Sequence, residues 1–413
     1  MTPSKATLTL SKSEARRLSL TRQHLTASRP DPTPDGLRTV LRSLRYLQLD
    51  PVNVVAASHE LVVWSRLGAE AGPHLSAAWW QDRWLFEYWA HAAAIVLTED
   101  YPLHRATMDT YPPPNRSFTQ VWLDANVVLA KHVLSRLAEG TPLPTEAFDD
   151  CAAMDWPSSG WTAGRNVERM LTFLWLQGKV MVQAREGGLR LWGLPDACLP
   201  PDADRQPMSA EQKVTTATEH TLRALGVARP LDIRQYFLRG QYDGLPGVLR
   251  SLTEQGRVIP VRVEGGKPNE TWYVHADAED ELTAIRSGDW HGRTVLLSPF
   301  DNLISDRRLT QRLWDFDFRN EMYIPKAKRQ YGYYLLPIVH EDQLVGRISP
   351  RVERKRDSLL VEGIHLEPGV KPTAALRRAV VGQLEDLAAF RGVSDIEYGE
   401  VLPDGWRASL LSS

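Results

Sequence analysis

Three stretches of the sequence share one pattern, in which an apolar run with helical spacing leads into an extended apolar run. The three pairs of runs are residues 40–44 and 47–52, residues 170–174 and 177–182, and residues 248–252 and 255–259. The pentapeptide Val-Leu-Arg-Ser-Leu occurs in identical form in the first and third stretches. A pattern that recurs along one chain indicates a repeated structural unit.

The second and third stretches continue in the same way. Gly178 and Gly256 follow the helical runs, at the position where a helix often ends in a left-handed residue. Two β-like runs around a glycine turn come next, at residues 180–192 and 258–274. A helix, a glycine stop and a two-stranded hairpin predict a winged helix.

The residues upstream complete both patterns. Residues 127–137 and 212–225 have helical apolar spacing, and a short proline-marked segment follows each, at residues 142–148 and 230–237. This is the order of a helix-turn-helix. In the first stretch no wing is legible, although residues 52–64 are apolar and β-branched in places. We therefore expect three tandem winged-helix units, the first of them inferred from its ending alone.

The pattern changes after about residue 285, where short β-like runs surround helical ones. The β-like runs are residues 294–297, 331–339, 344–348 and 359–366, and the helical runs are residues 307–313 and 373–390. They predict a separate α+β domain, so the expected fold class is α+β and mostly helical. The expected domains are winged helix 1 (1–108), winged helix 2 (109–204), winged helix 3 (205–285) and the C-terminal α+β domain (286–413), with joints near 199–207 and 277–281.

Composition limits the classes of protein that remain. The 413 residues are 43% hydrophobic and 24% charged, which is typical of a globular protein and argues against disorder. Cys151 and Cys198 cannot form a disulfide framework or a four-thiolate zinc site. No secretory signal is visible and no apolar run approaches the ~18 residues needed to span a bilayer. We expect a cytoplasmic protein without a membrane partner.

Charge favours a nucleic-acid partner only locally. The net charge is −2, yet residues 1–50 carry nine Lys and Arg against four acids, and residues 351–356 add three more positive charges. Such runs are often solvated faces, and that interpretation stays open. Winged helices usually bind duplex DNA, but some bind proteins instead. The function must therefore be argued from a site.

The segment Gln48-Leu49-Asp50-Pro51 is the candidate site. Pro51 disfavours the α region at Asp50, so a helix must end near Gln48 and the chain must leave it extended. In extended chain, Gln48 and Asp50 point to one side and Leu49 points to the core, so one amide and one carboxylate face a common spot. The alternative is that both side chains merely satisfy backbone groups at a helix end.

The sequence resembles the YcaQ/AlkZ winged-helix DNA glycosylases in an ordered set of motifs spread over roughly residues 10 to 390. Gln48-Leu49-Asp50 matches the Gln-x-Asp form of that family's catalytic motif. The further matches are Tyr88-Trp89-Ala90-His91-Ala92, Leu297-Ser298-Pro299-Phe300-Asp301-Asn302-Leu303, Asp306-Arg307-Arg308, Tyr323-Ile324-Pro325, Lys328-Arg329 and Gly332-Tyr333-Tyr334. The tripeptide alone is a weak signal, whereas the ordered set is a strong one.

The resemblance implies a bacterial-type monofunctional enzyme that excises alkylated bases from double-stranded DNA and unhooks interstrand crosslinks. It implies three winged helices around a concave DNA channel. An open channel suits a crosslinked base, which cannot swing into a deep pocket because it is tethered to the opposite strand. In the family, members with the Gln-x-Asp form have the broader substrate range. We expect a monomer that acts on the nucleoid.

The chemistry fits one carboxylate and one amide. A purine alkylated at N7 or N3 is cationic and leaves as a neutral base, so it needs little help from a general acid. Asp50 can stabilise the oxocarbenium sugar and accept the proton of the attacking water, while Gln48 holds that water. No cofactor, metal or lyase lysine is required.

Other residues are candidates for contacts with DNA. They are Arg45, Tyr88, Trp89, His91, Arg307, Arg308, Lys328 and Arg329. His91 is as well explained as a structural residue. The basic residues after 300 have acids nearby in sequence, so ion pairs within the chain are an equal alternative. Asp315 and Asp317 lack further ligands at a metal-site spacing, and no phosphate-binding glycine loop is present.

Two other functions remain open at this point. The chain could be a non-enzymatic winged-helix DNA-binding protein or transcriptional regulator, in which Gln48 and Asp50 are structural. It could also be a protein-interaction scaffold, which predicts no salt-sensitive binding of DNA. Release of free base from alkylated DNA separates the enzyme from both.

Overall fold

The protein is described by a computed structural model over residues 8–157, 165–267 and 269–410. It divides into two compact units. Unit 1 contains Met1–Leu75 and Ala217–Ser413, and unit 2 contains Ser76–Thr216. The two boundaries fall within the helices α4 (Gly72–Trp80) and α10 (Ala210–Leu225).

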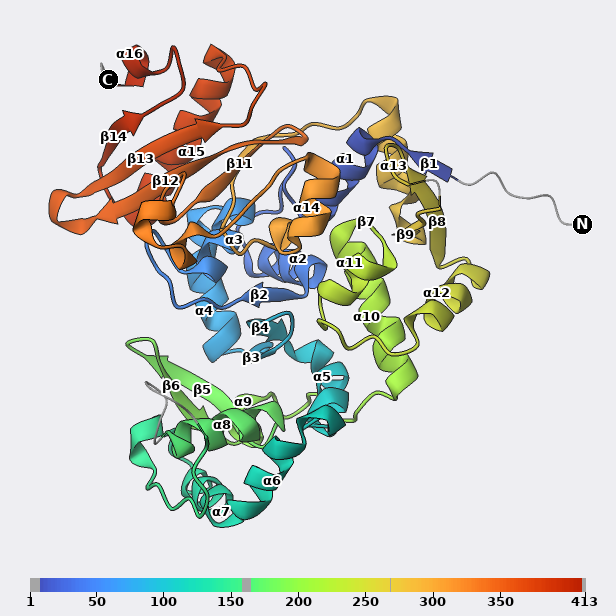
Figure 1. Cartoon of the computed structure of the whole chain (residues 1–413), viewed down its shortest axis with the longest axis vertical. Helices are drawn as coiled ribbons and strands as arrows, with labels where there is room; N and C mark the ends of the chain where they lie inside the picture. The colour runs from blue at the N-terminus through green and yellow to red at the C-terminus, as the bar shows by residue number, and fades with distance from the viewer. Residues whose placement is uncertain (1–7, 158–164, 268, 411–413) are drawn as a thin grey trace, which may run out of the picture. The chain divides into compact units, whose positions relative to one another are not determined.

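Unit 1 contains a mixture of helices and sheets (Figure 1). Its helices are α1 (Lys12–Arg22), α2 (Pro34–Leu44), α3 (Ser58–Leu67), α11 (Pro230–Gln235), α12 (Leu245–Glu254), α13 (Glu279–Ser287), α14 (Arg307–Trp314), α15 (Ala374–Arg391) and α16 (Arg407–Leu410). Its strands are β1 (Leu8–Leu10), β2 (Tyr46–Gln48), β7 (Val227–Ala228), β8 (Val258–Val263), β9 (Trp272–His275), β10 (Thr294–Leu296), β11 (Leu336–His340), β12 (Gln343–Glu353), β13 (Ser358–Leu366) and β14 (Asp395–Val401).

Unit 2 is mainly helical and contains two β-hairpins. Its helices are α5 (Tyr101–Met108), α6 (Ser117–Ala125), α7 (Val127–Leu137), α8 (Asn166–Leu176) and α9 (Pro195–Cys198). Its strands are β3 (Leu85–Trp89), β4 (Ala93–Leu97), β5 (Met181–Glu186) and β6 (Leu189–Gly193). Short 3-10 turns include η4 (Thr145–Ala147) in unit 2, and η7 (Glu321–Tyr323) and η8 (Lys326–Lys328) in unit 1.

The C-terminal part of unit 1 is a five-stranded sheet in the order β10-β11-β12-β13-β14, with α15 packed against it (Figure 1). Neighbouring strands are antiparallel except β13 and β14, which are parallel. Helix α15 is the helix predicted at residues 373–390; Thr373 caps its start and left-handed Gly392 ends it. The predicted strands and helices of this domain are present, and β14 was not predicted.

The core of this sheet also takes in residues that follow Asp50 in the sequence. Val55 and Ala56 are fully buried in it, together with Leu61 and Trp64 of α3. The apolar, partly β-branched run at residues 52–64 is therefore not a wing, because α3 begins at Ser58 and turns its apolar side chains into the core. This packing fixes the chain on the C-terminal side of Asp50.

The winged helix expected in the third stretch is present in unit 1. Helix α10 is followed by β7, α11, α12 and the antiparallel hairpin β8–β9, and β7 pairs with β9 (Figure 1). Gly256 follows α12 with φ of 71°, which is the left-handed stop that the sequence predicts. Strand β1 extends this sheet by pairing with β8 in parallel.

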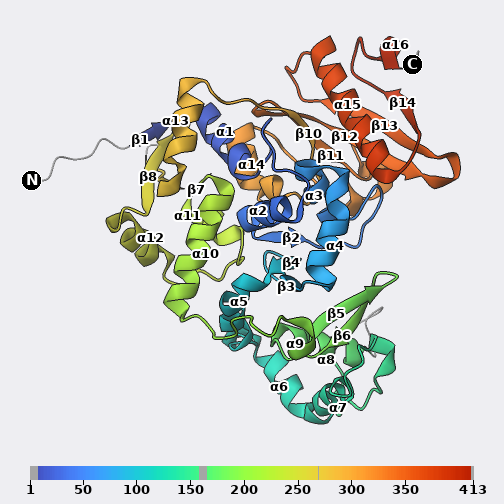
Figure 2. The ribbon, with the colours of Figure 1, turned by 180° about the vertical axis from the view of Figure 1, so that it is seen from behind.

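Unit 2 contains the winged helix expected in the second stretch. Helix α7, the turn η4 and helix α8 precede the antiparallel hairpin β5–β6, which lies beside α8 (Figure 2). A bridge between Leu143 and Trp192 adds a third extended segment to the hairpin. Gly178 is left-handed with φ of 65°, as predicted.

The first stretch has the same order of elements but a different starting point. The repeated pentapeptide ends α2, which leads into β2, α3, α4 and then the hairpin β3–β4. In the third stretch the same pentapeptide lies in α12, directly before a hairpin. The shared pentapeptide therefore led us to equate two helices that hold different places in the fold. Helix α2 is the first helix before its hairpin, whereas α12 is the last one before its hairpin.

The expected α+β fold class is confirmed, with helices, antiparallel hairpins and one larger sheet. The division into four domains at residues 108, 204 and 285 stays a prediction. Among the described residues, no helix is long and apolar enough to cross a bilayer.

Candidate active site

Strand β2 brings Gln48 to the surface of unit 1. Helix α2 ends at Leu44, where Arg45 adopts a left-handed conformation with φ of 70° and donates its backbone N–H to the carbonyl of Leu41 at 2.7 Å. The extended chain begins directly afterwards, at Tyr46. Arg45 thus has a conformational role at the helix end.

Two buried side chains hold the backbone on either side of Arg45. The hydroxyl of Tyr236 donates to the carbonyl of Leu44 at 2.9 Å, and the amide of Asn302 donates to the carbonyl of Tyr46 at 3.1 Å. The same amide donates to the Tyr236 hydroxyl at 3.1 Å. Burial raises the pKa of Tyr236 well above its usual value, so this hydroxyl remains a donor. A network of hydrogen bonds therefore fixes the backbone that leads to Gln48.

The exposure pattern differs from the predicted one at a single residue. Tyr46 and Leu47 are buried, while Gln48, Leu49 and Asp50 are all partly exposed. Leu49 was predicted to point into the core, but Leu47 is the buried leucine and Leu49 is partly exposed. Gln48 and Asp50 both reach solvent, as a site that meets a large substrate requires.

The carboxylate of Asp50 accepts one hydrogen bond on each oxygen. Oδ1 accepts from the backbone N–H of Val52 at 2.9 Å, which closes a local turn over Pro51. Oδ2 accepts from the hydroxyl of Tyr323 at 3.3 Å. One oxygen therefore has the structural role that the alternative interpretation proposed, and the other is held by a residue far away in the sequence.

A rigid segment carries Tyr323. The buried carboxylate of Glu321 accepts three backbone N–H groups through Oε2, from Gln330 at 2.9 Å, Tyr331 at 2.9 Å and Gly332 at 3.1 Å. Arg329 donates through Nε to the carbonyls of Glu321 and Ile324, and its guanidinium lies 4.7 Å from the ring centre of Tyr333. Arg329 was predicted to contact phosphate, but these contacts give it a role in shaping the segment.

Tyr334 lies next to this site on its buried side. Its side chain is 1% exposed, and its hydroxyl has no hydrogen-bond partner among the described residues. Burial, followed by the negative charge of Asp50, raises the pKa of Tyr334, so the phenol is neutral. Buried polar groups are rarely left without a partner. This hydroxyl is buried close enough to the site for the charge of Asp50 to act on it. Sequence reasoning noted Tyr323 and Tyr334 only as parts of motifs and gave them no role.

The candidates in unit 2 fall into two kinds. Tyr88 is 2% exposed and donates its hydroxyl to the carbonyl of Leu176 at 2.8 Å, so it is a core residue rather than one accessible to DNA. Trp89, its neighbour on β3, is 47% exposed because successive strand residues face opposite sides. His91 lies in the turn between β3 and β4 and is partly exposed.

Three of the basic candidates in unit 1 are exposed and form no ion pair within the described chain. Arg307 and Arg308 are exposed at the start of α14, and Lys328 is exposed on η8. Within the described chain, none of the three forms an ion pair. Their contact with phosphates stays a prediction. Lys326, on the same turn, is equally exposed and was not singled out.

Arg308 also lines a shallow basic groove. The groove is lined by Lys12, Arg229, Leu231, Gly265, Arg308, Gln311, Arg312 and Asp315. The ion pairs of its other cations are Lys12 with Asp315, Arg229 with Asp232 and Glu270, and Arg312 with Glu270. The other cations of the groove are therefore paired within the chain, and Arg308 differs from them.

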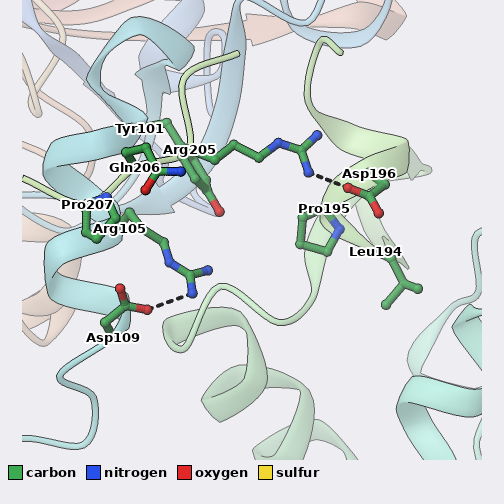
Figure 3. A pocket seen from close by; sticks show the side chains of 9 residues that line it. All are labelled: Tyr101, Arg105, Asp109, Leu194, Pro195, Asp196, Arg205, Gln206 and Pro207. Atoms are coloured by element: carbon green, nitrogen blue, oxygen red, sulfur yellow. Dashed lines mark hydrogen bonds and ion pairs between the residues drawn. The ribbon is translucent and has the colours of Figure 1, made fainter. Parts of the chain in front are cut away.

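A pocket in unit 2 lacks the features of a catalytic site. Arg105 pairs with Asp109 at 2.7 Å and Arg205 pairs with Asp196, so both cations of the pocket face carboxylates (Figure 3). Tyr101 lines the same pocket. None of the residues predicted from the sequence lines it. Across the described part of the chain, no three His, Cys, Asp or Glu side chains are placed to hold a metal ion.

Comparison with known proteins gives one family. The sequence model of that family, described as DNA glycosylase AlkZ-like, matches residues 41–390, which is most of the chain. Among solved structures, the DNA glycosylase AlkZ of Streptomyces sahachiroi is similar, with a TM-score of 0.66 over 96% of this chain and 100% of that one. The two sequences are 18% identical, so this likeness concerns the fold.

Proposed function

The chain belongs to the AlkZ-like DNA glycosylase family, and we propose that it hydrolyses the N-glycosidic bond of cationic N-alkylated purines in duplex DNA and unhooks interstrand crosslinks. Gln48 and Asp50 are the proposed catalytic residues. The observation that carries this proposal is the Asp50 carboxylate, which reaches solvent while both of its oxygens are held by hydrogen bonds. An oriented, accessible carboxylate is what hydrolysis of this bond needs.

The reaction requires no covalent intermediate. The bond between C1′ and the purine nitrogen breaks, and the cationic base keeps the electron pair and leaves neutral. Asp50 stabilises the oxocarbenium sugar and accepts a proton as water adds to C1′. Gln48 positions that water with its amide. The enzyme is therefore proposed to be monofunctional, without a cofactor.

Contacts with the DNA backbone belong to the exposed residues. We assign phosphate contacts to Arg307, Arg308 and Lys328, and contacts with the duplex to Trp89 and His91. The proposal includes a monomer that acts in the bacterial cytoplasm, where the genome lies.

Base release tests the proposed reaction directly. We expect the enzyme to release N7-methylguanine from a duplex as well as to unhook an N7-linked crosslink, because the carboxylate of Asp50 activates water more strongly than an amide at the same position would. The measurement is free base by mass spectrometry, with unmodified duplex as the control. Activity on the crosslink without activity on N7-methylguanine would contradict the proposed substrate range, and no release from either duplex would favour a non-enzymatic DNA-binding protein.

Salt dependence tests the proposed phosphate contacts. Each neutralised phosphate contributes about −0.9 to the slope of log affinity against log salt concentration. We expect a steep slope for the wild type, and Arg308→Gln should make it shallower by about one such step. Arg205→Gln is the matched control, because Arg205 already pairs with Asp196. The measurement is fluorescence anisotropy on a labelled duplex. Equal slopes for the wild type and Arg308→Gln would remove Arg308 from the interface.

A further inference from the structure

The Asp50 carboxylate is oriented by two donors of different origin. The N–H of Val52 is local, and any residue that accepts this hydrogen bond would form the same turn. The hydroxyl of Tyr323 comes from 273 positions away and reaches the other oxygen at 3.3 Å. A carboxylate held on both oxygens cannot rotate freely, so its remaining lone pairs point in fixed directions.

The backbone of Tyr323 is held firmly although its side chain is exposed. Glu321 is buried and its carboxylate accepts the backbone N–H of Gln330, and Met322 packs into the core of the five-stranded sheet. The side chain of Tyr323 is nevertheless 67% exposed, so packing gives it little support. Its contact with Asp50 therefore lies on the accessible side of the carboxylate, where the substrate must approach.

We propose that Tyr323 is a positioning residue for hydrolysis, and that its hydroxyl orients the Asp50 carboxylate toward the attacking water. This inference rests on the proposed function. The phenol is suited to the role because burial, and then the charge of Asp50, raise its pKa, which keeps the hydroxyl protonated as a donor. Tyr323 itself need not touch the reacting atoms. Its effect on the rate passes through Asp50.

The test compares Tyr323→Phe with the wild type in single-turnover release of N7-methylguanine. We expect the rate at saturating enzyme to fall about 5- to 20-fold, which is the loss typical of one hydrogen bond to a charged group in an accessible site. The dissociation constant for the duplex should stay unchanged, because the ring is kept. Tyr333→Phe is the matched control, since it removes an exposed hydroxyl from the same segment and should leave the rate unchanged.

The role through Asp50 is separated from a merely structural role by a double substitution. In the Asp50→Asn background, Tyr323→Phe should cause no further loss, because the carboxylate that the hydroxyl orients is absent. Equal rates for the wild type and Tyr323→Phe, or the same loss in both backgrounds, would overturn the role of Tyr323 while leaving the proposed function intact. A wild type that releases no base would overturn the proposed function, and this inference with it.

Discussion

Replacing Asp50 by asparagine is expected to lower single-turnover base excision by at least roughly a hundredfold, about 2.7 kcal/mol of barrier. The substitution removes the charge that stabilises the oxocarbenium sugar and the base that takes the proton of water. It keeps the local geometry, because an asparagine oxygen can still accept from the N–H of Val52 and its amide can donate to the hydroxyl of Tyr323. The measurement is the single-turnover rate on N7-methylguanine duplex.

The same variant tests the alternative in which Asp50 is only a turn residue. Asparagine closes this kind of turn as well as aspartate does, so a purely structural Asp50 predicts an unchanged rate. Circular dichroism controls for folding, and duplex binding should not weaken, since a carboxylate near phosphates opposes binding. A near wild-type rate in folded Asp50→Asn would show that the proposed site is wrong.

Gln48→Ala tests the role of the other proposed catalytic residue. If Gln48 only positions water, its loss should lower the rate less than the loss of Asp50, because the carboxylate still stabilises charge. A larger loss for Gln48→Ala than for Asp50→Asn would reverse the assignment of roles. Both variants use the same duplex and the same single-turnover conditions.

The repeated pentapeptide shows what a local pattern determines and what it does not. In α2, Val40, Leu41 and Leu44 are buried, and the corresponding apolar residues of α12 are buried in the same spacing. Identical residues thus form the same amphipathic helix with the same buried face. Their order in the fold differs because it depends on the elements that come after each helix, β2 and two helices in one case and a hairpin in the other. Periodicity carries no information about that order.

Only the part of the candidate site that lies in one short segment of the sequence could be predicted. Pro51 and the i, i+2 spacing of Gln48 and Asp50 predict an extended segment that presents an amide and a carboxylate. The contact between Asp50 and Tyr323 depends on the core of the five-stranded sheet, which takes in residues after Asp50 and Met322 together. Such long-range packing cannot be predicted from the spacing of residues along the sequence. Strand β14 was missed because its apolar alternation is short: Ile396 and Tyr398 alternate with Asp395 and Glu397, and Gly399 then interrupts the pattern.

The largest expected effect on stability comes from the buried ion pair between Arg66 and Asp301. Both side chains are fully buried, and two hydrogen bonds of 2.7 and 2.9 Å join the guanidinium to the carboxylate. Arg66 belongs to α3, and Asp301 precedes Asn302, the residue that holds the carbonyl of Tyr46. The pair therefore connects the helix after the candidate site to the turn that supports the strand before it.

Asp301→Asn is expected to lower the free energy of unfolding by about 3 to 5 kcal/mol. The variant keeps the shape of the side chain but leaves a buried guanidinium without its counter-charge, and it places an amide donor against a guanidinium donor. The measurement is urea denaturation followed by tryptophan fluorescence. Asp196→Asn is the matched control, because that carboxylate is 87% exposed in its pair with Arg205 and should contribute about 1 kcal/mol or less.

Removing both charges distinguishes an unpaired charge from lost packing. In the double variant Arg66→Met with Asp301→Leu, neither charge is left buried alone, so it should lose less stability than Asp301→Asn despite changing two residues. A loss in Asp301→Asn no larger than that of the exposed control would mean that the buried guanidinium finds enough compensation in its bonds to the carbonyls of Gln23 and Val62. The ion pair would then be dispensable for the turn that holds Tyr46, and so for the geometry of the site.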